Sequence, residues 1–129
     1  MALFLVQISL MTKILVLDDD PDLLEMVEVV LVNHQMNVSC INKGSDLFST
    51  IDEINPQIIL MDIYLGDTDG RNLCQALKKS EKYKHIPVIL YSAGNISTSS
   101  IMDSLANEFI SKPFDVGNLV RKIKVLVGV

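Results

Sequence analysis

Five short apolar runs alternate with segments of helical periodicity, and this alternation limits the fold of the chain more than any other feature. The runs cover residues 13–17, 38–41, 58–61, 86–91 and 108–111. Strands joined through helices pair in parallel, with right-handed crossovers and with helices on both faces of the sheet. Continuous apolar strands fit a sheet that is buried on both faces. The alternation therefore predicts an α/β fold built on one parallel sheet.

The segments between the runs predict five helices, at residues 22–34, 44–53, 70–79, 96–106 and 116–127. Asp20 suits the N-cap of the first helix, and Pro21 suits its first turn. The fourth helix is rich in Ser and Thr, which have weak helical propensity. We therefore expect it to be the least stable element of the fold.

One domain accounts for nearly all of this pattern. A chain of 129 residues can build a single core, and its 49% of hydrophobic residues argues against disorder. We expect the domain to span residues 13–129 and residues 1–12 to form an apolar N-terminal extension. Three interpretations of the extension stay open: a start assigned upstream of Met11, an arm that covers a sheet edge or a neighbouring chain, or a weak anchor to a membrane or partner.

Charge and cysteine content narrow the class of function. The net charge of -5 and the lack of any basic run disfavour direct nucleic-acid binding. The longest apolar stretch is too short to span a bilayer, and it lacks the features of a signal peptide. Cys40 and Cys74 do not have the spacing of metal ligands, so we expect free thiols and a reducing, cytoplasmic compartment.

Polar and charged residues follow four of the five apolar runs. Asp18 and Asp19 follow the first run, Asp62 the third, Ser92 the fourth and Lys112 the fifth. In a parallel sheet these strand ends meet at one edge, where ligand sites form. Any one of these residues is explained as a solvated turn residue, whereas four strand ends at once point to a site.

The residue types at this edge predict phosphoryl transfer to a carboxylate. Three carboxylates repel each other, and a hard cation such as Mg²⁺, which also binds phosphate, relieves the repulsion. Lys112 can pair with a carboxylate or a phosphate oxygen, and Ser92 can donate to a phosphoryl oxygen. Such groups neutralise a transferring phosphoryl group and hold it in line.

These residues in this order resemble the receiver domain of two-component response regulators. The resemblance covers about Lys13 to Val127 and is carried by Asp18-Asp19, by Asp62 with the loop-closing Asp69-Gly70, by Tyr91-Ser92-Ala93 and by Lys112-Pro113-Phe114. It implies a flavodoxin-like, doubly wound sheet of five parallel strands in the order 2-1-3-4-5, with five helices. The chain resembles a stand-alone receiver of the chemotaxis-regulator type; a relay carrier and a fragment of a longer regulator stay open as alternatives.

The resemblance also implies a role for each acidic residue. Asp62 is the phosphoacceptor, Asp19 is a direct Mg²⁺ ligand and Asp18 is its water-mediated partner. Asp62 and the backbone carbonyl of Tyr64 complete the metal site. The side chain of Tyr64, two residues beyond the acceptor, is expected to shield the acyl phosphate from water.

A phosphorylation switch follows from the same resemblance. Lys112 contacts the phosphoryl group, Ser92 is the switch hydroxyl and Phe109 is the switch aromatic residue. The phosphoryl group adds a charge of about -1.5 to -2, which draws Ser92 and Lys112 toward it and vacates space for Phe109. The surface formed by the helix at 96–106, by the strand that follows it and by the last helix then changes.

The family implies a sensor histidine kinase or a histidine phosphotransfer protein as phosphodonor, and a downstream protein as target. We expect no direct nucleic-acid or membrane partner and no enzymatic turnover beyond slow autodephosphorylation. A homodimer would use the face of the helix at 96–106, which is the family's usual place for one. Gly66 stands where the family usually has proline, so we expect a looser loop after Asp62.

Two rival interpretations stay in view. A degenerate receiver that works only as an interaction module would lack an acid or the lysine, and none is missing here. A phosphatase of the haloacid-dehalogenase type would use Asp18-x-Asp20 as its nucleophile motif. That second interpretation calls for a longer chain with a cap, and it leaves the Asp62 loop unexplained.

Overall fold

The computed structural model describes residues 11–128, so residues 1–10 of the predicted extension at 1–12 lie outside the described part. Five parallel strands form one sheet in the order β2-β1-β3-β4-β5, which confirms the flavodoxin-like topology. The strands are β1 (Thr12–Leu17), β2 (Met36–Ile41), β3 (Ile58–Asp62), β4 (Val88–Ser92) and β5 (Glu108–Ser111).

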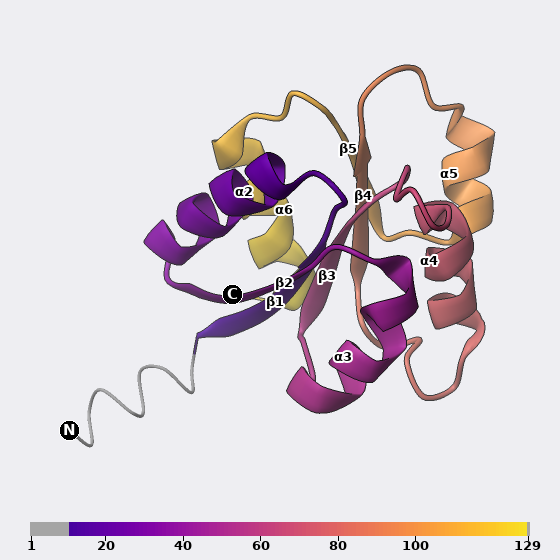
Figure 1. Cartoon of the computed structure of the whole chain (residues 1–129), viewed down its shortest axis with the longest axis horizontal. Helices are drawn as coiled ribbons and strands as arrows, with labels where there is room; N and C mark the ends of the chain where they lie inside the picture. The colour runs from indigo at the N-terminus through magenta and orange to yellow at the C-terminus, as the bar shows by residue number, and fades with distance from the viewer. Residues whose placement is uncertain (1–10, 129) are drawn as a thin grey trace.

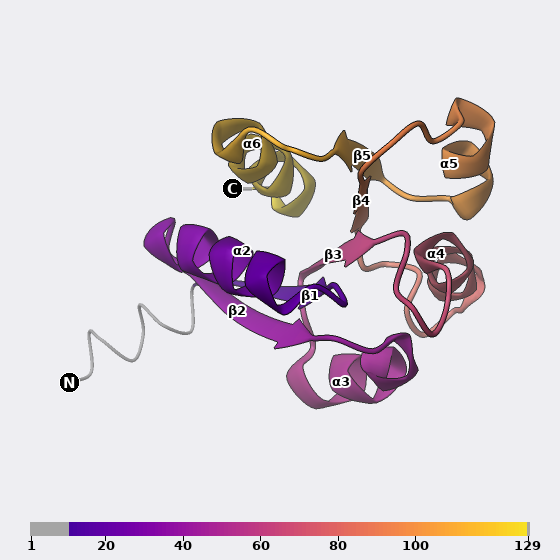
Figure 2. The ribbon, with the colours of Figure 1, turned by 45° about the horizontal axis from the view of Figure 1, so that its top comes forward.

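Helices cover both faces of the sheet (Figures 1 and 2). They are α2 (Pro21–Asn33), α3 (Leu47–Ile54), which follows the short 3-10 helix η1 (Gly44–Asp46), α4 (Gly70–Lys79), α5 (Thr98–Ser104) and α6 (Val116–Val127). α2 and α6 lie on one face, and α3, α4 and α5 lie on the other (Figure 2). Within residues 11–128, no helix has the length and apolar character needed to cross a membrane.

Successive strand residues point to opposite faces, so each strand contributes to two cores. Val16 and Leu60 pack on the side of α2 and α6, whereas Leu17 and Met61 pack on the side of α3 and α4. All four side chains are fully buried. The continuous apolar runs are therefore explained by a sheet without a solvated face, as predicted.

The observed elements differ from the predicted ones mainly at their ends. β4 begins at Val88, two residues later than predicted, because Pro87 has no N–H to donate to a strand ladder. The second helix begins as η1 and becomes α-helical only at Leu47. α5 is shorter than predicted, since it begins after the N-cap Ser97 and ends at Leu105, whose φ of 66° is left-handed.

Two aspartates fix the helix starts beside the carboxyl edge of the sheet. The Asp20 carboxylate accepts from the amides of Asp22 and Leu23 at 3.0 and 3.4 Å, which caps α2 as predicted. The Asp69 carboxylate accepts from the amide of Arg71 at 2.8 Å and caps α4. The loops that follow β1 and β3 therefore end at defined positions.

Candidate functional site

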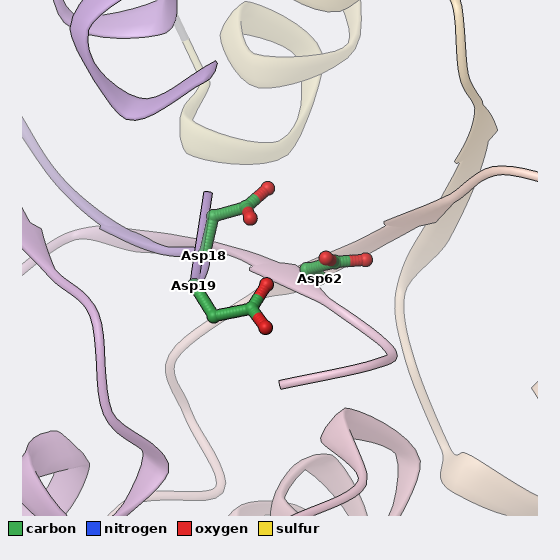
Figure 3. Close-up of side chains that lie close together, drawn as sticks. All are labelled: Asp18, Asp19 and Asp62. Carbon is green, nitrogen blue, oxygen red and sulfur yellow. The ribbon is translucent and has the colours of Figure 1, made fainter. Parts of the chain in front are cut away.

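Strand ends bring the three predicted acidic residues together. Asp18 follows β1 and Asp62 ends β3, and these strands are neighbours in the sheet. One carboxylate oxygen from each of Asp18, Asp19 and Asp62 lies within 4.8 Å of the others. Figure 3 shows the three side chains side by side at this edge. Asp18 and Asp62 are buried, and Asp19 is exposed.

Lys112, which follows β5, is shared by the two buried carboxylates. Its Nζ lies 3.1 Å from Asp18 Oδ2 and 3.3 Å from Asp62 Oδ2. The lysine side chain itself is only 18% exposed, so solvent screens these contacts weakly. One ammonium thus faces two carboxylates, which leaves the cluster with an excess of negative charge.

The acceptor candidate is the carboxyl group most affected by this excess. Burial raises the pKa of Asp62 above its usual range, and the charge of Asp18 raises it further. Lys112 and the backbone amide of Ile63 act in the opposite direction and only partly offset the rise in pKa. An additional cation at this edge would therefore stabilise the ionised form of Asp62.

Hard oxygen donors are what Mg²⁺ prefers, and the three carboxylates provide them. Two ligands on one Mg²⁺ lie no more than about 4.2 Å apart, given metal–oxygen distances of about 2.1 Å. The observed separations therefore fit a single ion after small side-chain rotations or with a bridging water. The three carboxylates therefore fit Mg²⁺.

The structure also assigns a contact that our sequence reasoning missed. Tyr91 donates its hydroxyl to Asp18 Oδ2 at 2.6 Å, although we had used Tyr91 only as part of the Tyr91-Ser92-Ala93 motif. One signal was available in the sequence: Tyr91 lies two residues after Ile89, so it points to the α2–α6 face, as Asp18 does two residues after Val16. The length of a tyrosine side chain spans the intervening strand.

The loop after Asp62 is attached at several points. The amide of Gly70 donates to the carbonyl of Ile63 at 2.7 Å. The Asp67 carboxylate accepts from the amides of Gly44 and Ser45 at 3.1 and 3.2 Å. A Cβ at position 70 would overlap the carbonyl oxygen of Asp62, so only glycine fits there.

Gly66 and Tyr64 occupy the part of this loop that lies beside the acidic cluster. Gly66 has a φ of 75°, which proline cannot adopt, so the proline usual in the family would not fit this loop conformation. The nearest neighbour of a Cβ at position 66 would be Asp19 Oδ2, at 3.4 Å. Tyr64 is 56% exposed, and the guanidinium of Arg71 lies 5.8 Å from the centre of its ring.

Arg71 links this loop to α5. It forms a salt bridge with Asp69 at 2.7 Å, and its Nη1 donates to Ser100 Oγ at 3.3 Å. The hydrogen bond from Arg71 holds the pKa of Asp69 below its usual range, against the opposing effect of burial. The start of α4 and the first turns of α5 are thereby connected by one side chain.

The two predicted switch residues lie on neighbouring strands. Ser92 ends β4, is almost fully buried and donates its hydroxyl to the adjacent carbonyl of Ala93 at 3.2 Å. Phe109 lies in β5, half-buried on the side of α3 and α4. Phe109 is therefore not part of the acidic cluster, and Ser92 stands at the strand end next to Asp62.

The chain is similar in sequence to one known protein family and to curated proteins. Residues 14–124 match the profile of the family described as response regulator receiver domain. The DNA-binding response regulator MtrA of Mycolicibacterium smegmatis is 28% identical over 114 residues, which are 87% of this chain and 49% of the relative. The chain spans about half the length of the curated relatives it matches first.

Solved structures agree with this result. A response regulator from Chloroflexus aurantiacus has a TM-score of 0.86 at 25% identity, over 92% of this chain and 99% of that one. The receiver domain of a sensor histidine kinase from Pseudomonas aeruginosa has a TM-score of 0.83 at 21% identity, over 92% and 99% of the two chains, and it holds a magnesium ion in its active site cleft. The second likeness concerns the fold alone.

Proposed function

The chain belongs to the response regulator receiver domain family, and on that premise we propose that it accepts a phosphoryl group on Asp62. The observation that carries this proposal is the position of Lys112 Nζ, which lies 3.3 Å from Asp62 Oδ2 and 3.1 Å from Asp18 Oδ2. A cation held beside a buried carboxylate, next to further acidic ligands, suits the capture of a phosphoryl group.

In the proposed reaction, a carboxylate oxygen of Asp62 attacks the phosphorus of the donor. A new phosphorus–oxygen bond forms, and the bond from phosphorus to the donor breaks, with its electron pair leaving on the donor. The product on this chain is an acyl phosphate. Lys112 then pairs with a phosphoryl oxygen, and Ser92 turns its hydroxyl from the carbonyl of Ala93 toward another.

We propose Mg²⁺ as the cofactor, held by Asp18, Asp19 and Asp62 together with the backbone carbonyl of Tyr64. When bound, the ion neutralises the carboxylates and the charge that develops on the phosphoryl oxygens. Asp19 is the exposed member of the cluster, so it is the ligand that solvent and the ion reach first.

We propose a sensor histidine kinase or a histidine phosphotransfer protein as donor, and a downstream protein that binds the surface of α5, β5 and α6 as target. The net charge of -5 supports a protein rather than a nucleic acid as direct partner of residues 13–129. The free thiols of Cys40 and Cys74 support a reducing, cytoplasmic location. We propose no turnover beyond slow loss of the phosphoryl group.

The phosphatase alternative has less support. Its nucleophile motif would need the carboxylates of Asp18 and Asp20 to take part in the reaction. Asp18 is fully buried, with hydrogen bonds to both oxygens, and Asp20 caps α2. No observation on residues 11–128 favours this second function.

Intact-mass analysis after incubation with acetyl phosphate tests the proposal. We expect a single phosphoryl adduct that requires Mg²⁺ and is absent from Asp62→Asn. Asp103→Asn is the matched control, because it makes the same chemical change on the exposed surface of α5, and it should keep the adduct.

Other results would support other functions. A folded, Mg²⁺-binding protein that forms no adduct would be a degenerate receiver that works through contacts alone. An adduct that survives in Asp62→Asn would place the acceptor elsewhere. Steady hydrolysis of a phosphomonoester would support the phosphatase.

A further inference from the structure

Tyr91 makes two contacts at the acidic edge that the proposed phosphoryl transfer does not use. Its hydroxyl donates to Asp18 Oδ2 at 2.6 Å, and Lys112 Nζ lies 4.5 Å from the centre of its ring. Tyr91 and Asp18 are both fully buried. Because Asp18 is not exposed to bulk solvent, solvent does not readily replace the hydroxyl if it is removed.

Asp18 depends on protein donors for both of its oxygens. Oδ1 accepts from the amide of Asp20 at 2.8 Å, and Oδ2 accepts from Tyr91 and from Lys112 at 3.1 Å. Lys112 is also the cation that turns to the phosphoryl group under the proposed function. Tyr91 is then the side-chain donor that remains on Asp18 Oδ2.

The donor is fixed in position by its packing. The ring of Tyr91 packs edge-on against Phe114, with centres 6.0 Å apart at 87°. The hydroxyl is therefore held as a donor to one carboxylate oxygen.

We propose that Tyr91 is a positioning residue of the metal site, whose hydroxyl fixes the Asp18 carboxylate beside Asp19 and Asp62 and thereby raises the affinity for Mg²⁺. This inference rests on the proposed function, because it takes Asp18 as part of a Mg²⁺ site. Groups that orient metal-binding side chains contribute about 10- to 100-fold to metal affinity. Tyr91 acts only through Asp18.

Isothermal titration calorimetry with Mg²⁺ on the full chain tests the proposal. Tyr91→Phe keeps the ring and removes only the hydroxyl, and we expect its dissociation constant for Mg²⁺ to rise about tenfold. Tyr83→Phe is the matched control, because Tyr83 also donates to a carboxylate, that of Asp52 in α3, at 2.8 Å. Its dissociation constant should stay within about twofold of wild type.

Two further measurements separate positioning from packing. Incorporation of 4-aminophenylalanine at position 91 places a donor on the same ring atom, and it should restore most of the lost affinity. In Tyr91→Phe, the Mg²⁺ concentration that half-saturates phosphorylation by acetyl phosphate should rise by about tenfold, whereas the rate at saturating Mg²⁺ should stay within about twofold of wild type. A residue that only fills the core would not produce this split.

The outcomes that overturn the proposal are distinct from those that overturn the proposed function. An unchanged dissociation constant in Tyr91→Phe, or no restoration by 4-aminophenylalanine, overturns the role of the hydroxyl while the receiver function stands. Wild-type protein that binds no Mg²⁺ overturns both.

If Tyr91→Phe does not fold, a measurement on the wild-type chain tests the proposal instead. The tyrosine Cζ resonances of ¹³C-labelled protein can be assigned with Tyr64→Phe and Tyr83→Phe. The Tyr91 resonance should then shift in step with Mg²⁺ saturation, because Mg²⁺ changes the charge around Asp18, which accepts the Tyr91 hydrogen bond. A Tyr91 resonance that does not move overturns the proposal.

Discussion

At the scale of single residues, the ionised carboxylate of Asp62 that the proposed function requires lowers the stability of the fold. Burial and the charge of Asp18 raise the pKa of Asp62, and Lys112 offsets this only in part. An ionised Asp62 therefore destabilises the folded state relative to a neutral side chain of the same shape. Reactive residues commonly carry such a cost, because function and stability place different demands on one position.

Asp62→Asn should accordingly stabilise the protein in Mg²⁺-free buffer at pH 7, by about 1 kcal/mol in the free energy of unfolding. The raised pKa means that the folded state binds this proton more tightly than the unfolded chain, so the penalty appears as pH rises through the folded-state pKa. The advantage of the variant should therefore shrink as pH falls through that pKa. Urea unfolding with EDTA measures both effects; a less stable variant at pH 7 would show that the Lys112 contact outweighs the burial of charge.

Under the proposed function, Tyr64→Asn should shorten the lifetime of the acyl phosphate by about fivefold, because we expect the ring to limit access of water. Tyr64 is two residues past the proposed acceptor and more than half exposed, with Arg71 beside its ring. Decay of the adduct mass over time measures the lifetime, with Tyr83→Asn as control. Equal lifetimes in wild type and Tyr64→Asn would remove the shielding role.

At the scale of elements, α5 differs from the other α-helices because it buries no apolar side chain. Ser104 is its one fully buried residue, and Met102 is 70% exposed. Two side-chain hydrogen bonds connect it to α4, from Arg71 to Ser100 Oγ and from Gln75 Nε2 to the carbonyl of Asp103 at 3.0 Å. These features support the expectation that α5 is the least stable helix.

Arg71→Gln should raise amide hydrogen exchange in residues 98–104 by about tenfold, since one of the few contacts that hold α5 is removed. Exchange in α6 should not change. Arg121→Gln is the matched control, because Arg121 donates to Asn118 within α6, on the exposed surface. A uniform rise in exchange across the chain would indicate global destabilisation instead of local loosening of α5.

At the scale of the whole molecule, the fold could be predicted because β1, β3 and β4 contain continuous apolar runs and because polar residues end or follow four of the five strands. The positions of Asp18, Asp62 and Lys112 at one edge follow from parallel topology alone. Contacts between side chains of distant elements could not be predicted, because they depend on side-chain length and on strand order together. The hydrogen bond from the Tyr91 hydroxyl to Asp18, which lies 73 residues away in the sequence, is the clearest example.

Mg²⁺ should stabilise the whole fold, because its proposed carboxylate ligands lie at the ends of two different strands, after β1 and at the end of β3. Free Mg²⁺ at a hundred times its dissociation constant adds about 2.7 kcal/mol to the free energy of unfolding by mass action. Thermal unfolding with and without Mg²⁺ measures this gain. Asp19→Asn should lose most of it, and Asp22→Asn, an exposed control in the first turn of α2, should keep it.

The attachments of the loop at 63–69 have a mechanical consequence. Asp67 ties this loop to the amides of Gly44 and Ser45, whereas nothing lies within 4 Å of a Cβ built at Gly94, in the loop after β4. If Asp62 accepts a phosphoryl group as proposed, we expect the loop after β4 to adjust to it more readily than the loop at 63–69. Beryllofluoride should then change hydrogen exchange in residues 93–104 and leave exchange at Gly44 and Ser45 unchanged. The reverse result would show that the loop at 63–69 and its contacts adjust instead.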